Sequence, residues 1–468
     1  MRSSFRVGTL AIAAALVTSG AAACGGGDGD GGGGEGQASS IKVWTIEDVA
    51  DRVAAQKRMA AAFTQKTGIK AEIIAVAEDQ FDQTITSAAA ANTLPDVIAA
   101  LPLAQVRSLS SNDLLNTEIA GEVVDKLGKD TFAPRSLELT KDGDKQLAVP
   151  SDGWAQLLVY RKDLFDAAGL QAPTTFEAIE TAARTLNKEG TAGITLATTP
   201  GDGFTQQSFE YLALANGCEL VGSDKKVTLD SPACVRTFDL YSKLAKNYSV
   251  RGNQDVDSTR ATYFAGKAAM LIWSSFILDE LAGLRNDALP TCAQCRSDKA
   301  WLAKNSGVVT AVKGPDAQRP ASYGEVVSFA ATSSAPKDAA SKFIEFMMSD
   351  SYDQWIAIAP EGKVPVRQGT KSGDTSYLQS WEKAKAGVDT KAPLSQYYSP
   401  EVLKQVQEAP ETFSRWGLTQ GQGALVGATL GPLPVPKALA DLIAGKGDAT
   451  SAAQAAQKAV EEIQKGIN

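Results

Sequence analysis

The chain has 468 residues, a formal net charge of −8 and no histidine. The absence of histidine excludes Ser-His-Asp and Cys-His nucleophilic sites, zinc sites that need imidazole and two-histidine iron sites. The acidic balance, with no block of Lys or Arg, argues against nucleic acid as a partner. A hydrophobic content of 44% over this length predicts a large core divided into more than one lobe.

The N-terminus has the layout of a secretory signal. Two arginines precede an apolar run over residues 7–17, and small residues follow up to Cys24. The apolar run is too short to span a bilayer as a stable helix. Residues 25–40 contain nine Gly and no large apolar side chain, so they predict a flexible tether. We therefore expect a signal peptide over residues 1–23.

The three alanines over residues 21–23, followed by Cys24, resemble the lipobox of bacterial lipoproteins. That family usually has Leu at the position of Ala21. The resemblance implies that Cys24 becomes the first residue of the mature chain, carries lipid (including palmitate) and begins the tether over residues 24–40. Such a protein is exported and anchored by its lipid to the outer face of the cytoplasmic membrane. Secretion without lipid stays the alternative.

The other four cysteines agree with export into an oxidising compartment. Four cysteines allow three pairings, and we expect nearest neighbours to pair, Cys218 with Cys234 and Cys292 with Cys295. The CxxC spacing of the second pair also occurs in zinc sites, but such sites need four ligands, and the chain has no second CxxC and no histidine. A structural disulfide is the favoured interpretation, and no metal is expected.

Strand-like and helical stretches alternate from residue 41 onwards. The first of them predict a parallel sheet covered by helices on both faces, because strand and helix follow one another as βαβ units. The predicted strands of this run cover residues 41–44, 69–76 and 97–100, and its predicted helices cover 49–66 and 81–91.

A second alternating region begins near residue 146 and continues to the C-terminus. Thr175 is well placed to cap the N-terminus of one of its helices, and residues 151–154 lie between two of its predicted strands. The predicted strands cover 146–150, 156–160, 191–199, 268–273, 307–312 and 325–330. The other predicted helices cover 162–168, 204–216, 234–246, 258–265, 337–348 and 451–467.

Several short stretches, each a weak motif alone, occur in a specific order along the body of the chain. They are Ile41–Trp44, Phe63–Ile69, Leu94–Ile98, Leu147–Pro150, Val159–Phe165, Ala168–Leu170, Pro173–Phe176, Phe264–Met270, Ala339–Phe346 and Val364–Val366. Together they resemble the family 1 extracellular solute-binding proteins of ABC importers, the group that includes maltose-binding protein. One departure is Arg161, where that family more often has Asn.

The resemblance implies an α/β, periplasmic-binding-protein-like fold of two lobes, each a sheet flanked by helices, with a hinge that the chain crosses more than once. The N-terminal lobe would comprise residues 41–149 and 305–350, and the C-terminal lobe residues 150–304 and 351–468. The resemblance further implies a monomer without cofactor, which closes on a sugar or oligosaccharide and delivers it to the permease subunits of an ABC transporter.

A sugar site needs carboxylates or amides for the hydroxyls and aromatic rings for the flat faces of the sugar. In open α/β sheets, loops at the C-terminal ends of strands line such a cleft. By resemblance, Trp154 falls where maltose-binding protein has a ligand-binding side chain, and Trp273 or Phe276 falls where a ring-stacking aromatic sits. The predicted ligand-binding residues are Trp44, Glu47, Asp152, Trp154, Phe204, Gln206, Trp273, Phe276, Tyr323 and Glu325.

Several of these residues could have a purely structural role instead. Trp44 could be a core residue, Glu47 could favour the N-terminus of the next helix, and Asp152 could belong to a structural turn. Two other functions also stay open, a surface lipoprotein for adhesion or sensing and a glycoside hydrolase that pairs Glu47 or Asp152 with Glu325. Without histidine, ligand affinity is expected to vary little between roughly pH 6 and 8, because unperturbed Asp and Glu are ionised there.

Overall fold

The computed structural model describes residues 38–77, 80–188 and 190–467. The predicted signal peptide, the predicted lipid site at Cys24 and most of the predicted tether lie outside these residues. Within the described residues, no helix is both long enough and apolar enough to cross a membrane.

The predicted βαβ run forms one end of the sheet. Strand β1 (Ser40–Thr45) lies between β2 (Lys70–Ala75) and β3 (Val97–Pro102), and both pairings are parallel. Helix α1 (Ala50–Thr67) connects β1 to β2, and helix α2 (Phe81–Ala90) connects β2 to β3. The predicted parallel sheet is therefore confirmed, with element ends shifted by one or two residues.

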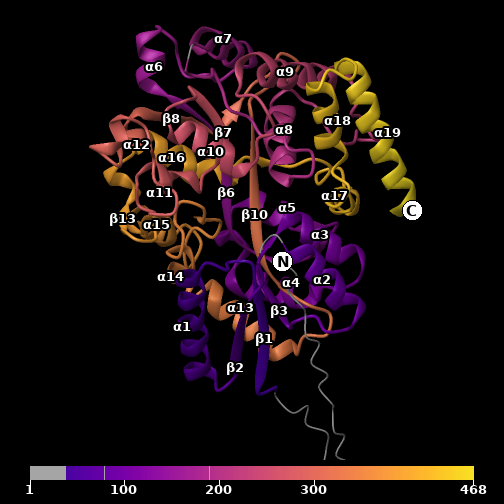
Figure 1. Cartoon of the computed structure of the whole chain (residues 1–468). Coiled ribbons are helices and arrows are strands. Elements are labelled where there is room, and N and C mark those ends of the chain that lie inside the picture. Colours follow the sequence, from indigo (N-terminus) through magenta and orange to yellow (C-terminus); the bar gives the residue numbers. More distant parts are fainter. Residues whose placement is uncertain (1–37, 78–79, 189, 468) are drawn as a thin grey trace, which may run out of the picture. The chain divides into compact units, whose positions relative to one another are not determined.

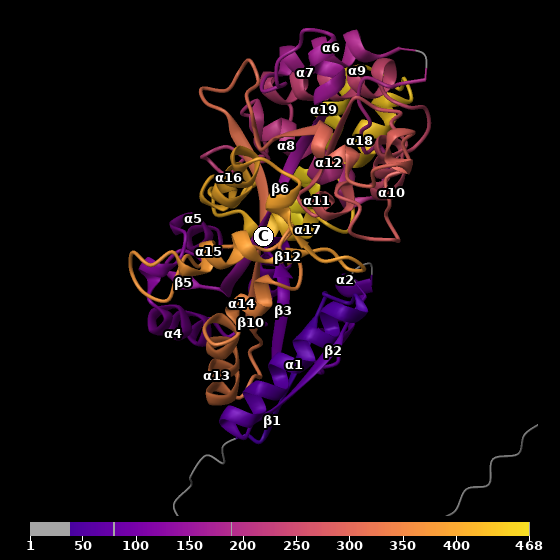
Figure 2. The same cartoon turned by 90° about the vertical axis from the view of Figure 1, so that its left-hand side faces the viewer.

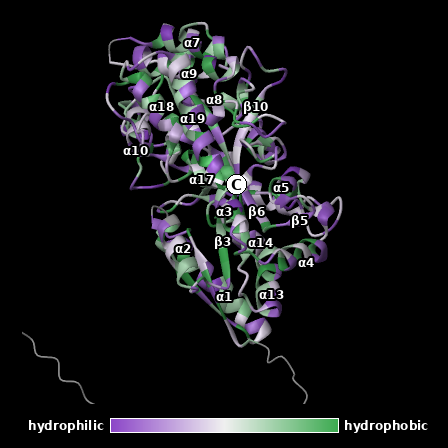
Figure 3. Cartoon of the chain, turned by 90° about the vertical axis from the view of Figure 1, so that its right-hand side faces the viewer, coloured by the Kyte–Doolittle hydropathy of each residue, from purple (hydrophilic) through white to green (hydrophobic). Residues whose placement is uncertain are grey.

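Burial explains why these residues form these elements. Met59 and Phe63 lie one turn apart on α1 and are both buried in the core. Gly68 ends the helix with φ +76°, a left-handed conformation that glycine adopts without steric cost. Strand β3 is buried almost throughout, and Figure 3 shows it as one of the hydrophobic segments.

Two long antiparallel strands, β6 (Val149–Arg161) and β10 (Ala321–Ala331), tie this parallel sheet to the rest of the chain. The last residues of β10 pair with β3, and its first residues pair with β9 (Ala311–Val312) and β14 (Phe413–Ser414). The second half of β6 pairs with strands further along the chain. These are β7 (Met270–Ser274) and β8 (Ser306–Val309).

The predicted separation of strands 146–150 and 156–160 is wrong, because β6 runs through residues 151–154 without a break. Its residues pair on one side with β10 and on the other with β11 (Val364–Pro365). Gly153 permits this pairing, since a Cβ atom there would lie 3.0 Å from the Phe413 ring and 3.0 Å from a β10 carbonyl oxygen. Buried polar residues inside a strand conceal it from a hydrophobicity pattern.

The predicted strand over residues 191–199 is also absent. This segment makes isolated bridges instead, Thr191 with Lys188, Ala192 with Ala268 and Thr195 with Leu271. The predicted N-cap is confirmed, because the Thr175 side chain accepts a hydrogen bond from the Ala178 backbone N–H at 3.1 Å.

Helices cover both parts of the sheet. The first set is α3 (Leu103–Ser111), α4 (Thr117–Leu127), α5 (Pro134–Leu139), α6 (Lys162–Ala167), α7 (Phe176–Leu186), α8 (Gly203–Ala215), α9 (Pro232–Tyr248), α10 (Val256–Phe264), α11 (Ile277–Leu281) and α12 (Trp301–Asn305). The second set is α13 (Lys337–Met348), α14 (Tyr352–Ile356), α15 (Ser376–Lys383), α16 (Pro400–Glu408), α17 (Gly423–Thr429), α18 (Pro434–Ile443) and α19 (Ala449–Ile467). Two hairpins of two-residue strands complete the structure, β4 (Lys141–Asp142) with β5 (Lys145–Gln146) and β12 (Lys385–Ala386) with β13 (Ala392–Pro393).

Figures 1 and 2 show how these elements lie within residues 38–467. Helices α7 and α9 lie at the end away from β1 and β2, and β6 and β10 run between the two ends. Helix α17, late in the chain, packs on α3, early in the chain. A Cβ atom on Gly427 of α17 would lie only 3.1 Å from Cβ of Ser108 on α3, so the two helices approach closely.

The predicted disulfides are both present. Cys218, just after α8, is bonded to Cys234 in α9. Cys292 is bonded to Cys295 across one short turn. Each bond closes a local loop, so both cross-links hold neighbouring segments rather than distant parts of the sheet.

The close packing of Phe413 on β10 gives a test of this fold. An Ala side chain at Gly324 would bring Cβ to 2.1–2.3 Å from the Phe413 ring atoms, whereas nothing lies within 4 Å of a Cβ at Gly121 in α4. We expect Gly324→Ala to lower the free energy of unfolding by about 1–3 kcal/mol, and Gly121→Ala to raise it by about 0.5–1 kcal/mol. Urea unfolding measures both. Equal stability of Gly324→Ala and the parent would contradict the packing of Phe413 on β10.

Candidate functional site

A buried lysine joins three segments that lie far apart in the sequence. Lys363, just before β11, is only 1% exposed. Its Nζ lies 2.6 Å from Oε1 of Glu47, which follows β1, and 3.2 Å from Oδ2 of Asp152 in β6. Oδ1 of Asp152 accepts hydrogen bonds from Trp355 Nε1 and Ser151 Oγ, each at 2.7 Å. Glu47 and Asp152, both predicted to bind ligand, therefore already have ion-pair and hydrogen-bond partners within the protein.

Arg52 extends this cluster to a predicted aromatic residue. Its Nη1 lies 2.9 Å from Oε2 of Glu47, and its Nη2 lies 3.5 Å from Oε1 of Glu361. The guanidinium carbon lies 5.5 Å from the centre of the Phe276 ring, a cation–π contact. We call Glu47, Arg52, Asp152, Glu361 and Lys363 the buried charge cluster.

The two carboxylates that Lys363 joins have opposite pKa shifts. Burial alone would raise the pKa of Glu47, but the positive charges of Lys363 and Arg52 outweigh burial and lower this pKa to about 2. Burial raises the pKa of Asp152, and Lys363 only partly offsets that effect. Of these two carboxylates, Glu47 is thus the one that stays ionised at neutral pH.

A second group of predicted residues lies where β6 pairs with β10. Trp154 stands opposite Glu325 in the register, and its ring centre lies 6.1 Å from that of Tyr323. Arg415 lies over the Tyr323 ring at 4.9 Å and forms ion pairs with Glu325 and Glu210. Oε1 of Glu325 also accepts a hydrogen bond from a backbone N–H at the start of α3.

The members of this second group differ in exposure. Tyr323 is fully buried, and its hydroxyl has no hydrogen-bond partner within the described residues. Glu325 is buried as well, whereas Trp154 is half-buried. Trp154 is therefore the member that a ligand can reach most easily.

A third group lies beside β7. The rings of Phe204 and Trp273 are 6.1 Å apart, and Trp273 Nε1 donates to the backbone oxygen of Val256 at 3.1 Å. Both rings are buried, whereas Gln206 and Phe276 are half-buried. Of the two predicted ring-stacking candidates, the structure leaves Phe276 the more accessible and packs Trp273 into the core.

The remaining predicted residue, Trp44, lies within the parallel sheet. It pairs with Ile74 of β2 and Ile98 of β3, and it is half-buried against an apolar cluster. The predicted residues thus fall into several groups. The three predicted carboxylates all form ion pairs within the protein. Four of the other predicted side chains are partly exposed. These are Trp44, Trp154, Gln206 and Phe276.

Sequence reasoning missed the basic residues that hold these carboxylates. Lys363 and Arg415 lie more than 200 and 80 positions, respectively, from the acids Asp152 and Glu325 that they contact. The stretch Val364–Val366 was part of the family resemblance, so the adjacent Lys363 is the one that a motif could have indicated. Within the described residues, no three His, Cys, Asp or Glu side chains gather as a metal site.

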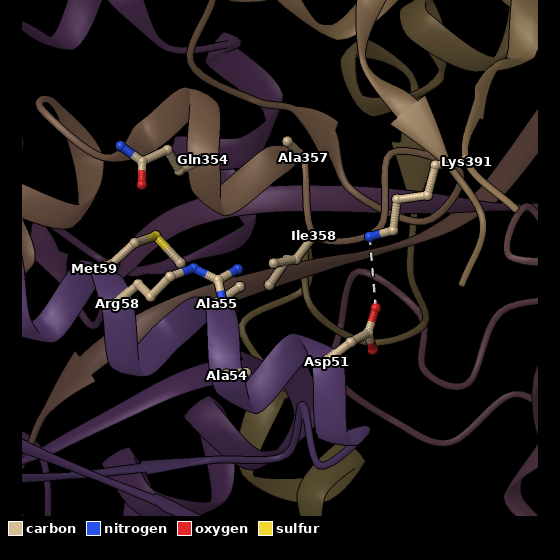
Figure 4. A pocket seen from close by; sticks show the side chains of 9 residues that line it. All are labelled: Asp51, Ala54, Ala55, Arg58, Met59, Gln354, Ala357, Ile358 and Lys391. Atoms are coloured by element: carbon tan, nitrogen blue, oxygen red, sulfur yellow. Dashed lines mark ion pairs between the residues drawn. The ribbon is translucent and has the colours of Figure 1, made fainter. Parts of the chain in front are cut away.

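A separate groove of about 340 Å³ lies between α1 and α14 (Figure 4). Its floor is mostly apolar, and an ion pair between Asp51 and Lys391 at 3.6 Å crosses one end. It contains none of the predicted ligand-binding residues.

Comparison with known proteins identifies the family. Residues 47–354 match the sequence model of the bacterial extracellular solute-binding proteins. The chain belongs to this family. It is 25% identical over 423 residues to YcjN of Escherichia coli K12, named as an ABC transporter periplasmic-binding protein, covering 88% of this chain and 90% of YcjN.

Solved structures of solute-binding proteins share its two-lobe α/β fold. The GacH receptor of Streptomyces glaucescens, solved unliganded and with acarbose, matches with a TM-score of 0.69 and 20% identity, over 92% of this chain and 99% of GacH. A sugar transporter protein of Arthrobacter chlorophenolicus with bound laminaribiose matches with a TM-score of 0.68 and 19% identity, over 90% of this chain and 99% of that protein. The predicted fold class is thereby confirmed.

The buried charge cluster predicts that removing the charge of Lys363 destabilises the fold far more than removing the charge of Lys391. Replacing Lys363 by Met leaves Glu47 and Asp152 without their shared cation, so we expect a loss of about 3–5 kcal/mol of unfolding free energy. The same substitution at Lys391, which is exposed and pairs with Asp51, should cost under about 1 kcal/mol. Urea unfolding at neutral pH measures both. Similar small losses in the two variants would contradict a structural role of Lys363.

Proposed function

We propose that this protein captures a sugar or oligosaccharide between its two lobes and delivers it to the permease subunits of an ABC transporter. The observation that carries the proposal is the pair of half-buried rings, Trp154 and Phe276, in a chain of this family. Trp154 lies in the central stretch of β6, and the Phe276 ring packs on Gly362, two residues before the strand that pairs with Gly153. Flat aromatic faces suit the apolar faces of sugar rings. The acarbose and laminaribiose complexes of the related folds agree with this ligand class.

The proposed mechanism is mechanical and includes no covalent step. The ligand enters between the lobes, stacks on the rings and exchanges hydroxyl hydrogen bonds with neighbouring polar groups, and the lobes then close. The strands β6 and β10 are the connections about which closure takes place. A glycoside hydrolase would need two free carboxylates, whereas Glu47, Asp152 and Glu325 are each engaged with a cation in this structure.

The proposal includes export and lipid attachment at Cys24, with the Gly-rich residues 25–37 as the tether, because Ser40 already belongs to β1. A Gly-rich tether of that length would reach about 18–22 Å, enough to keep a monomeric body near the membrane without contact. One acyl chain gives only marginal membrane binding, so two or more are proposed.

Mass spectrometry of the membrane-extracted protein tests the proposed lipid attachment, with a diacylated peptide that begins at Cys24 as the expected product.

A ligand screen tests the central proposal. We expect at least one of maltose, laminaribiose and acarbose to raise the melting temperature, because a ligand at 100 times its Kd stabilises the native state by about 2.7 kcal/mol. No shift across these and a broad panel of other sugars would contradict the proposal. Appearance of cleaved sugar in the same samples would favour the hydrolase instead.

Two aromatic substitutions localise the binding. Trp154→Ala and Phe276→Ala should each weaken affinity for the sugar identified above by about tenfold or more, since about 1.4 kcal/mol corresponds to a factor of ten. Trp301→Ala is the matched control, because Trp301 is also half-buried but stacks on Arg161 at 4.7 Å. Calorimetric titration measures the three affinities. Unchanged affinity in both site variants would remove these rings from the site.

A further inference from the structure

Asp279 is a buried carboxylate without a hydrogen-bond partner among the described residues. Asp279 of α11 is 0% exposed, and neither of its carboxylate oxygens has a hydrogen-bond partner within the described residues. Oε2 of Glu361, in the buried charge cluster, is likewise buried and unpartnered. An ionised carboxylate in such surroundings is strongly disfavoured, and binding of a proton removes the charge.

The charged groups that act on Asp279 come from α11 itself, from α1 and from the segments after α11 and before β11. Negative charge comes from Glu361, before β11, and from the adjacent Glu280, and positive charge from Arg285, after α11, and Arg52 of α1. The Tyr398 side chain also faces it, but its hydroxyl donates to the Leu278 backbone oxygen at 2.6 Å.

The cations near Asp279 are already engaged with other acids. Arg285 donates to both oxygens of Asp287, at 3.1 and 2.8 Å. Arg52 is shared by Glu47 and Glu361, as described above. Arg260 is shared by Asp257 and Glu280, at 2.6 and 2.8 Å, and Lys363 by Glu47 and Asp152. Among the described residues, Asp279 is thus the acid in this region with no ion-pair partner.

Burial and like charge act in the same direction on this group. Burial, together with the negative charges of Glu361 and Glu280, raises the pKa of Asp279 well above its usual value. Burial also raises the pKa of Glu361, and it raises the pKa of Glu280 to about 7. The expectation that ligand affinity varies little with pH assumed unperturbed Asp and Glu, so it does not extend to these three acids.

We propose that Asp279 and Glu361 together hold a proton that regulates the ligand site. Arg52 connects the pair to that site, because it pairs with Glu361 and lies over the Phe276 ring. Loss of the proton adds a negative charge beside Arg52, draws the guanidinium away from Phe276 and drives α11 and the segment before β11 apart. The pH thus controls how Phe276 is presented to the ligand. The regulatory part of this proposal rests on the sugar-binding function proposed above.

The sign of the stability change follows from linkage. A carboxyl group whose pKa is raised by folding binds more protons in the native state, so its contribution makes stability fall as pH rises from the unfolded pKa to the folded pKa. Asp279→Asn is isosteric and carries no titrating charge. The ratio of unfolding constants, parent over variant, should increase with pH by up to about tenfold per pH unit in this window.

The experiment compares the full chain, Asp279→Asn, Glu361→Gln and the control Asp239→Asn by urea unfolding from about pH 5 to 9. Asp239 is exposed on α9, and its variant should follow the parent at every pH. Infrared difference spectra at neutral pH, parent minus Asp279→Asn or parent minus Glu361→Gln, should show a carboxylic-acid carbonyl band. Parallel stability curves for the parent and both buried-acid variants, without such a band, would overturn the proposal.

Ligand titration tests the regulatory part separately. With laminaribiose, or whichever sugar of the panel binds, the affinity of the parent should fall with rising pH while that of Asp279→Asn stays constant. An equal fall in both would overturn regulation but leave the buried proton supported. If no sugar binds, the proposed function fails, and the unfolding and infrared data still decide whether the proton is held.

Discussion

The interaction on which the rest of the structure depends is the ion pairing of Lys363 with Glu47 and Asp152. One ammonium group, shielded from water, links the end of β1, the middle of β6 and the start of β11. A buried ion pair adds little stability over well-packed apolar side chains, but removal of one partner is costly. The cluster therefore specifies which segments meet. It fixes the parallel sheet, strand β6 and the segment before β11 in one arrangement.

The same cluster divides the candidate site into supporting and accessible parts. Its carboxylates are occupied by Lys363 and Arg52, so they position backbone and neighbouring rings rather than present free oxygens. The half-buried Phe276 ring lies against Arg52 of this cluster, whereas the half-buried Trp154 ring lies near Tyr323 in the second group. Glu47 pairs with two cations, so it stays ionised although it is buried. Where compensation by cations is incomplete, as at Asp279, a proton takes the place of a cation.

Local signals in the sequence predicted much of the fold. The alternation of strand-like and helical stretches indicated α1, and Thr175 indicated the start of α7, because each signal depends on residues a few positions apart. The predicted short-range disulfides were correct for the same reason. Residues 151–154 were misassigned, since buried Ser and Asp imitate a turn unless the partners on β10 and β11 are known.

The site was predictable only in part, because its chemistry depends on contacts between distant residues. Nothing in the sequence near Glu325 indicates Arg415, and nothing near Asp152 indicates Trp355. The family resemblance placed Trp154 and Phe276 among the candidates, and the structure keeps both half-buried. Their contact with a ligand stays a prediction, as do the proposed lobe boundaries.

The central claim is that this solute-binding protein takes a sugar at these rings. The most direct measurement is a crystal structure of the complex with the sugar that raises the melting temperature most. We predict a sugar ring packed against Trp154 or Phe276, with ligand atoms in contact with both lobes. A sugar bound instead in the groove between α1 and α14, away from both rings, would contradict the claim.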